Sequence, residues 1–389
     1  MRKIAVITGA RSDYYMLYWI IKGFYEDPDI ELQLIVTGMH LSNEFGLTIE
    51  GIKKDGFPIT ESVQMLLSSD SPEAIALSMG IGTSGFARVF QRLKPDIILV
   101  LGDRFEIFAA VSASVPFRIP VAHIHGGEIT EGAMDELFRH AITKMSFFHF
   151  PTNPIYAHRI KQMGEMPQNI FCFGTPGLDY IHKSSLLSKK QLSRRLNIPE
   201  HKKWGIITYH PVTFGKNHVE IEIKALLDAL IGNGIKDMFW IFTKPNADND
   251  GRIIIKLIEQ FVSQNQDCSI FFNSIGKHYL SLLKHCDIMI GNSSSGLIEA
   301  PTFELPVVNV SDRQKGRIRG INVIEVPVVE KSAIINAIGK ALSNEFKLSL
   351  KGMQNPYGNG TASDNIMNTL KSVQLKDQYI KMFYDFSFL

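Results

Sequence analysis

The chain has 389 residues, of which 45% are hydrophobic and 21% are charged, and its formal net charge is +2. This length exceeds what one hydrophobic core usually serves, so it predicts two domains. The near-neutral charge argues against nucleic acid or a membrane surface as a partner, and any anion must be bound locally.

The N-terminus and the cysteines predict a cytoplasmic protein. The segment "MRKIAVITGARSDYY" has a short apolar run and no signal-peptide cleavage pattern, and no segment of the chain has membrane length. Cys172, Cys268 and Cys286 lack the paired spacing of a metal site or a disulfide framework, which fits a reducing compartment. We interpret all three as buried small hydrophobic residues.

Short apolar runs, each followed by a polar turn and a helical pattern, recur along the chain. The first half contains "KIAVITG", "IELQLIVTG", "PDIILVLGD" and "IPVAHIHGG", and the second contains "WGIITYHP", "MFWIFTKP", "DIMIGNS" and "LPVVNVS". Strands that are apolar throughout belong to parallel sheets covered by helices on both faces. The two sets predict an α/β protein with two Rossmann-like doubly wound domains. The polar stretch from Ile181 to Lys203 is interpreted as a linker with a short helix, or alternatively as a surface helix within one domain.

Polar clusters follow six of the predicted strands. They are "GARSDY", "GDRFE" and "HIHGGE" in the first half, and "YHPVT", "TKPNAD" and "GNSSSGLIEA" in the second. Ligands of open parallel sheets bind beyond the carboxyl ends of the strands. Two sheets that face each other across a cleft would bring these clusters together.

In the first half, Arg11 and Asp13 are predicted in a turn before the helix "YYMLYWIIKGF", and Asp103 and Arg104 lie in "GDRFE". Either aspartate would serve as a helix cap, and Asp103 with Arg104 as a structural ion pair. Alternatively, a carboxylate and a cation at strand ends are what proton transfer near a departing anion needs. His123, among apolar residues, is either a core histidine or part of the site.

The motif "GIGTSG" has the glycine spacing of a dinucleotide-binding loop, but a helical pattern precedes it where a strand is required. We predict a packing turn there. In "GNSSSGLIEA", the serines open an apolar helix whose unpaired N–H groups suit a phosphate, although the serines would also serve as plain helix caps. Glu299 is placed to accept hydrogen bonds from a ribose, and Arg313 to pair with phosphate unless it is a solvated surface residue. Together they favour a nucleoside diphosphate.

The combined motifs, with "DELFRHAITK" and "KPNAD", resemble the UDP-N-acetylglucosamine 2-epimerase family, and specifically its hydrolysing branch, from Ile4 to about Asn365. The resemblance implies two Rossmann-like domains in the GT-B arrangement. The N-terminal domain with the catalytic carboxylates covers 1–182, and the UDP-binding domain covers 183–362. A C-terminal helix within 363–389, from about Ser363 to Tyr384, returns to the first domain. The resemblance implies no metal or nicotinamide cofactor, and a homodimer or homotetramer.

The segment from Val121 to His140 carries a cluster of four carboxylates, Glu128, Glu131, Asp135 and Glu136, and the reaction of that family explains this carboxylate cluster. UDP leaves by anti elimination with loss of the sugar C2 proton, and water adds to the glucal intermediate to give a free 2-epimerised sugar. Carried over by motif, Asp103, Glu128 and Asp135 are acid and base candidates, and His210 contacts phosphate or the leaving group. The residues carried over as contacts of UDP or the sugar are Arg11, Asp13, Arg104, Asn246, Ser274, Asn292, Ser293, Ser294, Glu299 and Arg313.

One position departs from the family. The chain has His125 in "HIHGGE" where the animal hydrolysing enzyme has an acid in "HIEGGE". Either His125 takes over proton transfer, which an imidazole performs near neutral pH, or Glu128 supplies the missing carboxylate. We rank Glu128 first because it restores the charge.

We therefore expect conversion of UDP-N-acetylglucosamine and water to UDP and free N-acetylmannosamine. UDP-2,4-diacetamido-2,4,6-trideoxyglucose is the alternative substrate, because motifs that contact UDP do not separate the two sugars. A GT-B glycosyltransferase would need an acceptor pocket but not this carboxylate cluster. A non-catalytic sugar-nucleotide sensor would have no use for several acids.

Overall fold

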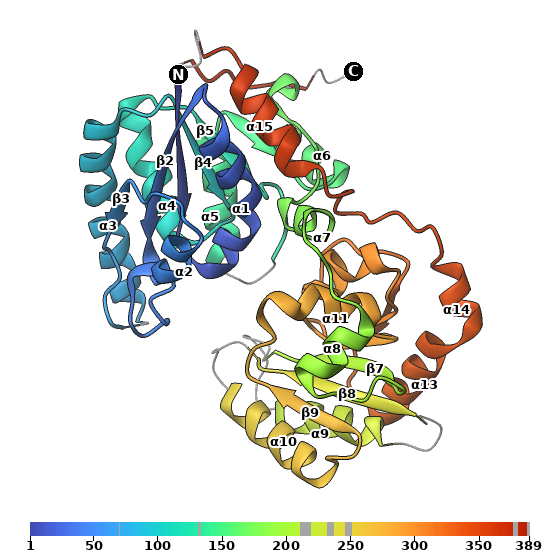
Figure 1. Ribbon diagram of the computed structural model, residues 1–389. Helices are drawn as coiled ribbons and strands as arrows, with labels where there is room; N and C mark the ends of the chain where they lie inside the picture. Colours follow the sequence, from blue (N-terminus) through green and yellow to red (C-terminus); the bar gives the residue numbers. More distant parts are fainter. Residues whose placement is uncertain are drawn as a thin grey trace. The chain divides into compact units, whose positions relative to one another are not determined.

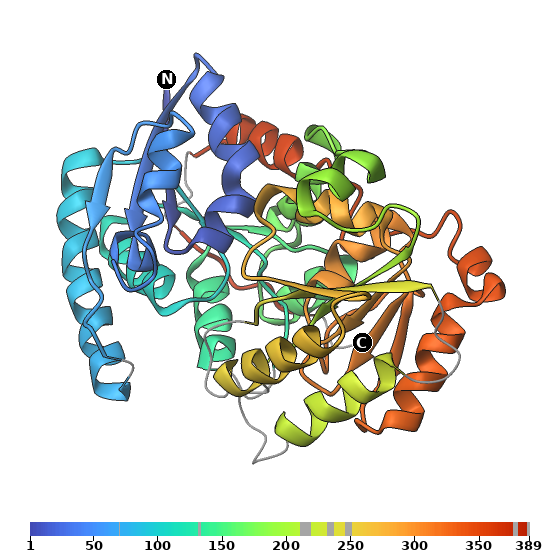
Figure 2. The same cartoon turned by 60° about the horizontal axis from the view of Figure 1, so that its bottom comes forward.

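The chain folds into two compact units. The structure, a computed structural model, describes residues 1–69, 71–130, 134–210, 219–231, 237–245, 251–375 and 380–386. Unit 1 comprises Met1–Lys183 and Tyr357–Leu389, and unit 2 comprises Ser184–Pro356. In Figures 1 and 2 the red helix α15 lies beside the blue helix α1, so the C-terminal part of the chain returns to unit 1.

Unit 1 is built on a six-stranded sheet in the order β3-β2-β1-β4-β5-β6, in which every neighbouring pair is parallel. The chain winds outward from β1 to β3, returns to the middle, and winds the other way from β4 to β6. The winding direction therefore switches between β1 and β4, where ligands of doubly wound sheets bind. The strands are β1 (Arg2–Thr8), β2 (Ile30–Thr37), β3 (Glu61–Val63), β4 (Ile97–Leu101), β5 (Val121–Ile124) and β6 (Phe148–Phe150).

Helices cover both faces of this sheet, which is why its central strands are apolar at successive positions. In β1, Ile4 and Val6 pack into the core under α1, α2 and α15. Ala5 and Ile7 pack into the core under α3, α4 and α5. The helices of unit 1 are α1 (Arg11–Glu26), α2 (Ile49–Lys54), α3 (Pro72–Leu93), α4 (Phe105–Ser114), α5 (Met134–Met145), α6 (Pro154–Gln162), α7 (Asp179–Lys183) and α15 (Ala362–Ser372).

Unit 2 repeats the same topology with six parallel strands in the order β12-β11-β10-β7-β8-β9. Its switch point lies between β7 and β10, and α9, α10 and α13 bury one face of the sheet. The strands are β7 (Lys203–Thr208), β8 (Met238–Thr243), β9 (Ser269–Phe272), β10 (Ile288–Gly291), β11 (Val307–Val310) and β12 (Val323–Val326). The helices are α8 (Lys189–Leu196), α9 (Val219–Leu230), α10 (Gly251–Gln264), α11 (Tyr279–His285), α12 (Ser295–Ile298), α13 (Lys331–Leu342) and α14 (Asn344–Ser349).

The predicted fold class is confirmed, because all eight apolar runs form strands and both sheets are parallel and doubly wound. The sequence analysis missed β3, β6, β9 and β12. These four short strands form the edges of the two sheets. The polar stretch before β7 contains α8 as its predicted short helix, and a hydrogen bond of 3.1 Å from Leu187 N to Ser281 Oγ joins it to unit 2.

Two predictions of local structure are wrong. The "GIGTSG" segment lies inside α3, which begins after the N-cap Ser71, and forms no turn. Two of its glycines serve packing, because a Cβ on Gly82 would lie 2.7 Å from Met65 and one on Gly85 would lie 2.7 Å from Val63. A Cβ on Gly80 would have no atom within 4 Å. The last helix, α15, ends at Ser372, and the described residues 380–386 are not helical.

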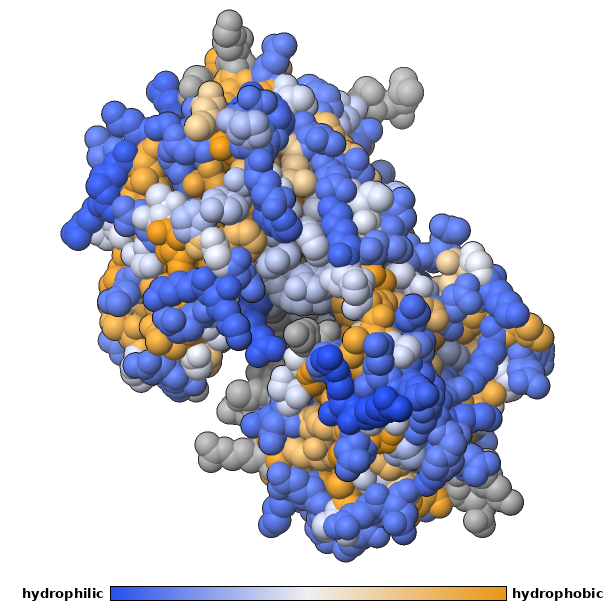
Figure 3. Space-filling model, viewed as in Figure 1, coloured by the Kyte–Doolittle hydropathy of each residue, from blue (hydrophilic) through white to orange (hydrophobic). Residues whose placement is uncertain are grey.

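The cysteines are also less buried than predicted. Cys172 is exposed, Cys268 and Cys286 are partly buried, and all three are free thiols. Figure 3 shows a mostly hydrophilic face interrupted by small apolar patches. Within the described part of the chain, no helix is both long enough and apolar enough to cross a membrane.

Candidate active site

The switch point of unit 1 gathers charged side chains from the ends of β1 and β4. Arg11 and Asp13 lie within the first turn of α1, whereas a turn before this helix was predicted for them. Asp103 and Arg104 directly precede α4. Arg11 is exposed and lines a cavity of about 380 Å³ together with Tyr14 and Tyr180.

Arg104 does not pair with Asp103, contrary to one interpretation of the sequence. Its Nε lies 2.6 Å from Oε1 of Glu106, a carboxylate that is completely buried. Two glycines make room for this side chain, because a Cβ on Gly9 would lie 2.6 Å from Glu106 Cγ and one on Gly38 would lie 3.0 Å from Oε1. The sequence analysis did not single out Glu106.

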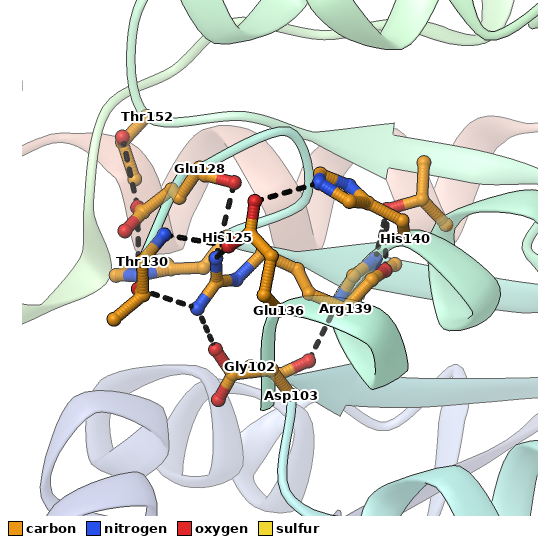
Figure 4. Close-up of polar contacts among 11 residues, drawn as sticks. Gly102, Asp103, His125, Glu128, Thr130, Glu136, Arg139, His140 and Thr152 are labelled. Carbon is orange, nitrogen blue, oxygen red and sulfur yellow. Dashed lines mark hydrogen bonds and ion pairs between the residues drawn. The ribbon is translucent and has the colours of Figure 1, made fainter. Parts of the chain in front are cut away.

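Asp103 instead pairs with Arg139 of α5 (Figure 4). The Arg139 side chain is 3% exposed, and its Nη2 donates both to Asp103 Oδ2 and, over 2.9 Å, to Thr130 Oγ1. Its Nη1 donates to Glu136 Oε2 over 2.7 Å and to the Glu128 carbonyl over 3.0 Å. One buried guanidinium therefore holds the loop after β5 against the loop after β4.

His125 and Glu128 form a dyad in the loop after β5. His125 has a φ of 68°, in the left-handed region that few non-glycine residues adopt, and both side chains are buried. Its Nδ1 lies 3.2 Å from Glu128 Oε1, and its Nε2 lies 2.9 Å from Thr175 Oγ1. Thr152 Oγ1 donates to the same Glu128 oxygen over 3.3 Å. The residue that replaces the family acid and the nearest carboxylate are thus in direct contact, and the strained backbone is typical of functional loops.

His123 belongs to the core. Its Nε2 contacts the Gly102 carbonyl at 2.8 Å, and its Nδ1 contacts Thr143 Oγ1 at 3.2 Å. Complete burial lowers the pKa of His123 to about 3, so the ring is neutral. Of the two alternatives left open by the sequence, the structure favours the satisfied core histidine.

Burial changes the acidity of two aspartates near the switch point. It raises the pKa of Asp135, which is partly buried, to about 6, and the charge of Asp103 acts in the same direction against Arg104 and Arg139. It raises the pKa of Asp13 to about 7, against the opposing charge of Arg104. Neither Asp13 nor Asp103 is the N-cap of the helix beside it, since Ala10 and Arg104 hold those positions.

In unit 2, Asn292 follows β10 at the switch point, and its side chain hydrogen-bonds to the loop after β7 and to the loop after β11. Its Oδ1 accepts from His210 N over 2.7 Å, and its Nδ2 donates to the His210 carbonyl over 2.9 Å and to Ser311 Oγ over 3.3 Å. The side chain is fully buried, and these hydrogen bonds hold the loops together; a substrate contact of Asn292 stays a prediction. Gly291 before it has a φ of 132°, and a Cβ there would lie 2.0 Å from the Thr208 carbonyl oxygen.

The predicted phosphate-binding residues of unit 2 either follow Asn292 in sequence or contact it. Arg313 Nη1 donates to the Asn292 carbonyl over 3.2 Å and is partly buried, so it is not a solvated surface residue. Ser293 and Ser294 are partly buried, and the helix after them, α12, has one turn. Ser295 N donates to Ser293 Oγ over 3.4 Å, so the capping interpretation holds only weakly.

Burial shifts the pKa values of both His210 and Glu299 in the direction of their neutral forms. Burial, with the nearby Arg313 cation, lowers the pKa of His210 to about 4, so the imidazole is uncharged at neutral pH. Burial raises the pKa of Glu299. Ser274 is exposed and follows β9 at the far edge of the sheet, two strands away from β7. Asn246 lies outside the described residues.

The structure adds site residues that the sequence analysis did not choose. They are Glu106, Thr130, Glu136, Arg139, Thr152 and Thr175. Arg139 and Glu136 could have been chosen from the sequence, since both lie in the quoted motif "DELFRHAITK". Within the described ranges, no group of three His, Cys, Asp or Glu side chains is arranged to hold a metal ion.

Comparison with known proteins decides the family. A family model described as UDP-N-acetylglucosamine 2-epimerase matches residues 22–371. A Campylobacter jejuni protein named GDP/UDP-N,N'-diacetylbacillosamine 2-epimerase (hydrolyzing) is 39% identical over 99% of this chain and 99% of its own. The chain belongs to the UDP-N-acetylglucosamine 2-epimerase family. The predicted resemblance to the hydrolysing branch of this family is confirmed, and the protein is an enzyme that acts on a UDP-sugar.

Other members of the 2-epimerase family agree with this assignment. A Legionella pneumophila protein named UDP-N,N'-diacetylbacillosamine 2-epimerase (hydrolyzing) is 35% identical and covers 98% of both chains. The fold matches the crystal structure of the Neisseria meningitidis UDP-GlcNAc 2-epimerase bound to UDP-GlcNAc, with a TM-score of 0.75 and 19% identity over 95% of this chain and 99% of that one. It also matches Staphylococcus aureus MnaA in complex with UDP, with a TM-score of 0.75 and 19% identity over the full length of both chains.

Proposed function

We propose that the protein hydrolyses UDP-2,4-diacetamido-2,4,6-trideoxyglucose, also called UDP-N,N'-diacetylbacillosamine, to UDP and a free 2-epimerised sugar. The observation that carries the choice of sugar is the name shared by the Campylobacter and Legionella relatives, at 39% and 35% identity over nearly the whole chain. UDP-N-acetylglucosamine, the substrate expected from the sequence, becomes the second candidate. A Neisseria meningitidis relative with 31% identity over 88% of this chain is named UDP-N-acetylglucosamine 2-epimerase.

The groups of unit 2 bind the UDP moiety in this proposal. Ser293 and Ser294 supply hydroxyl donors to the diphosphate, and Arg313 supplies a cation whose position is fixed by the Asn292 carbonyl. Glu299 accepts hydrogen bonds from the ribose. His210 donates to a phosphate oxygen as a neutral imidazole, because its pKa of about 4 leaves it uncharged at neutral pH. Donors aimed at the departing diphosphate lower the barrier to C–O cleavage.

The groups of unit 1 transfer protons on the sugar. Epimerisation at C2 requires a proton to leave one face of that carbon and another to arrive at the opposite face, so two groups must act. We assign one role to Asp135, whose pKa of about 6 lets it exchange a proton near neutral pH. The other role falls to Glu128 acting with His125, 3.2 Å away. Asp103, fixed by Arg139, stabilises positive charge that develops on the sugar ring as UDP leaves.

The bond between C1 of the sugar and the diphosphate oxygen breaks, and its electron pair leaves with UDP. A carboxylate takes the C2 proton and a C1–C2 double bond forms. A water oxygen then adds to C1 and gives its proton to a base, while C2 receives a proton on the face opposite to the one it lost. The products are UDP and a free sugar of inverted configuration at C2.

A substrate comparison tests the proposal. The purified protein is incubated with each of the two UDP-sugars, without added metal or nicotinamide, and UDP and the free sugar are followed by NMR. We expect kcat/KM to be at least tenfold higher for the diacetamido sugar, and both products to appear in equal amounts. A higher kcat/KM for UDP-N-acetylglucosamine would support the second candidate. Recovery of an epimerised sugar still attached to UDP would contradict the hydrolytic reaction.

The predicted cytoplasmic location and the homodimer or homotetramer remain predictions. Analytical ultracentrifugation of the purified protein at micromolar concentration tests the oligomeric state directly.

A further inference from the structure

Two buried carboxyl groups face one guanidinium at the switch point of unit 1. Asp13 is 7% exposed, and its Oδ1 accepts a hydrogen bond of 3.1 Å from Ser12 Oγ. Glu106 is fully buried, and its Oε1 lies 2.6 Å from Arg104 Nε. Among the described residues, neither Asp13 Oδ2 nor Glu106 Oε2 has a hydrogen-bond partner. A buried carboxylate oxygen without a donor is costly, so this arrangement requires a proton or a ligand.

The strongest charges around Asp13 include one cation. Among the described residues, the charged groups that act most strongly on Asp13 are Arg104, Glu106 and Asp103, and of these Arg104 alone is positive. Arg11, two residues away, is exposed to solvent. Arg139, the other buried arginine nearby, is already engaged by Asp103 and Glu136. Two buried carboxylates beside one cation cannot both stay ionised without a large electrostatic cost, so one of them retains a proton.

Glu106 is the carboxyl that holds the ion pair with Arg104. Its place is built into the backbone, since Gly9 and Gly38 leave no room for a Cβ beside it. Asp13 is left as the proton carrier. Burial and the charge of Glu106 both act in this direction, and the pKa of Asp13 is raised to about 7.

We propose that Asp13 carries a proton at neutral pH and donates it from Oδ2, as a hydrogen bond, to a phosphate oxygen of the UDP-sugar, with Glu106 as the positioning residue that keeps this proton on Asp13. The proposal rests on the function proposed above. It deepens the substrate contact expected for Asp13, because an ionised aspartate would repel the diphosphate that a protonated one binds. Asp13 lies two residues from Arg11, an exposed cation that suits the same anion.

Calorimetry of UDP binding between pH 7 and 9 tests the proposal. The Asp13→Asn variant, measured in parallel, corrects for the titration of UDP itself, whose terminal phosphate is still ionising at the lower end of that range and whose uracil N3–H begins to ionise at the upper end. Wild-type affinity should fall by up to tenfold for each pH unit above 7. Titrations at pH 8 in buffers of different ionisation enthalpy should show uptake of nearly one proton for each UDP bound. Asp13→Asn keeps a donor at the same position but cannot titrate. Its affinity should remain within about threefold from pH 7 to 9, and its proton uptake should vanish.

Glu106→Gln is the second variant, since it removes the charge that keeps the proton on Asp13. Its affinity for UDP should begin to fall at a lower pH than that of the wild type, a shift that a merely structural role would not produce. Asp29→Asn is the matched control, because Asp29 is an exposed carboxyl that precedes β2, at the amino ends of the strands, whereas Asp13 lies beyond their carboxyl ends. Its pH profile should equal that of the wild type.

The outcomes that overturn the proposal are distinct from those that overturn the function. Wild-type protein that binds UDP with constant affinity from pH 7 to 9 and without proton uptake would refute the role of Asp13 alone. A folded Asp13→Asn variant that no longer binds UDP would also refute it, since that result would show that the ionised carboxylate is required. Wild-type protein that binds no UDP would overturn the proposed function and this inference with it.

Discussion

Arg139 organises the acidic residues of unit 1. Its guanidinium contacts Asp103, Thr130, Glu136 and the Glu128 carbonyl, and it is almost completely buried. Removing one partner of such a buried ion pair leaves an uncompensated charge. Arg139 therefore explains how several carboxylates coexist near the ends of β4 and β5 without mutual repulsion unfolding the loops.

The three carboxylates assigned to catalysis are testable one at a time. Asp103→Asn, Glu128→Gln and Asp135→Asn keep shape and most hydrogen bonds but remove the charge. Each should leave the affinity for UDP unchanged and lower kcat by roughly 100-fold to 10,000-fold, through loss of a positioned acid or base at Glu128 and Asp135 and loss of charge stabilisation at Asp103. Glu26→Gln, an exposed carboxylate in the last turn of α1, is the control and should keep wild-type turnover. Full activity of all three variants at normal melting temperatures would make the cluster a structural network.

The contact between His125 and Glu128 predicts that the two residues act as one unit. Two groups that transfer the same proton lose their function together, so the effects of removing them are not additive. His125→Asn and Glu128→Gln should each lower kcat, and the double variant should be no more than about threefold slower than the slower single variant. Steady-state kinetics of the three variants measures this. Multiplicative losses would show that the two residues act independently, and normal turnover of His125→Asn would show that Glu128 works alone.

At the scale of single elements, the close approach of β10 to β7 depends on Gly291. A side chain there would meet the Thr208 carbonyl oxygen at 2.0 Å, and the φ of 132° is unfavourable for any other residue. Gly291→Ala should destabilise the protein by about 2 kcal/mol or more in urea denaturation. Gly339→Ala is the control, because Gly339 lies within α13 with no atom within 4 Å of an added Cβ. It should stabilise the protein by about 0.5–1 kcal/mol, and equal effects of the two substitutions would contradict the argument.

The same scale shows how far the sequence predicts the structure. The eight strands found from the sequence each contain at least four successive buried residues, and each pairs with neighbours on both sides. The four missed strands are edge strands of three or four residues. Partial exposure weakens the apolar signal of β3, β9 and β12, and β6 is buried but has only three residues. The glycines of α3 suggested a turn because glycine usually breaks helices, whereas here packing against Met65 and Val63 explains Gly82 and Gly85.

The site could be predicted only in part for a similar reason. Asp103 and Glu128 stand just beyond strand ends, where position along the chain reveals them. Asp135 lies in the first turn of α5 and was predicted from the family motif "DELFRHAITK". Glu106 and Arg139 lie inside helical patterns, where a charged residue usually faces solvent. Only the fold shows that both are buried. It also shows that Glu106 pairs with Arg104 and Arg139 pairs with Asp103, in place of the expected pair between Asp103 and Arg104.

At the scale of the whole molecule, the chain closes unit 1 with its own C-terminal part. Helix α15 packs against α1 at Gly23, where a Cβ would lie 2.1 Å from the Met367 sulfur. Its first turn is capped from a distant part of the chain. Asp179, fully buried, accepts hydrogen bonds from Ala362 N over 3.1 Å and from Ser363 N over 2.6 Å. Residues separated by the whole of unit 2 in sequence therefore stabilise one another.

This closure predicts a large effect of a single capping residue. Asp179→Ala leaves two buried N–H groups unpaired and should lower the free energy of unfolding by about 1–3 kcal/mol. Asp364→Asn, in the same helix turn, breaks only the ion pair with Lys183 and should cost less than about 1 kcal/mol. Urea denaturation of the two variants measures the difference. An Asp179→Ala variant as stable as Asp364→Asn would show that α15 does not need this cap.

The central claim is that the enzyme removes UDP by elimination across C1 and C2 and then hydrates the intermediate. The most direct measurement is the reaction of the wild-type protein with the diacetamido UDP-sugar in heavy water, followed by NMR of the released sugar. The account predicts that the free sugar carries deuterium at C2 and that one UDP is released for each labelled sugar. A free sugar that keeps its original hydrogen at C2 would contradict the elimination, and with it the roles given to Asp135, Glu128 and His125.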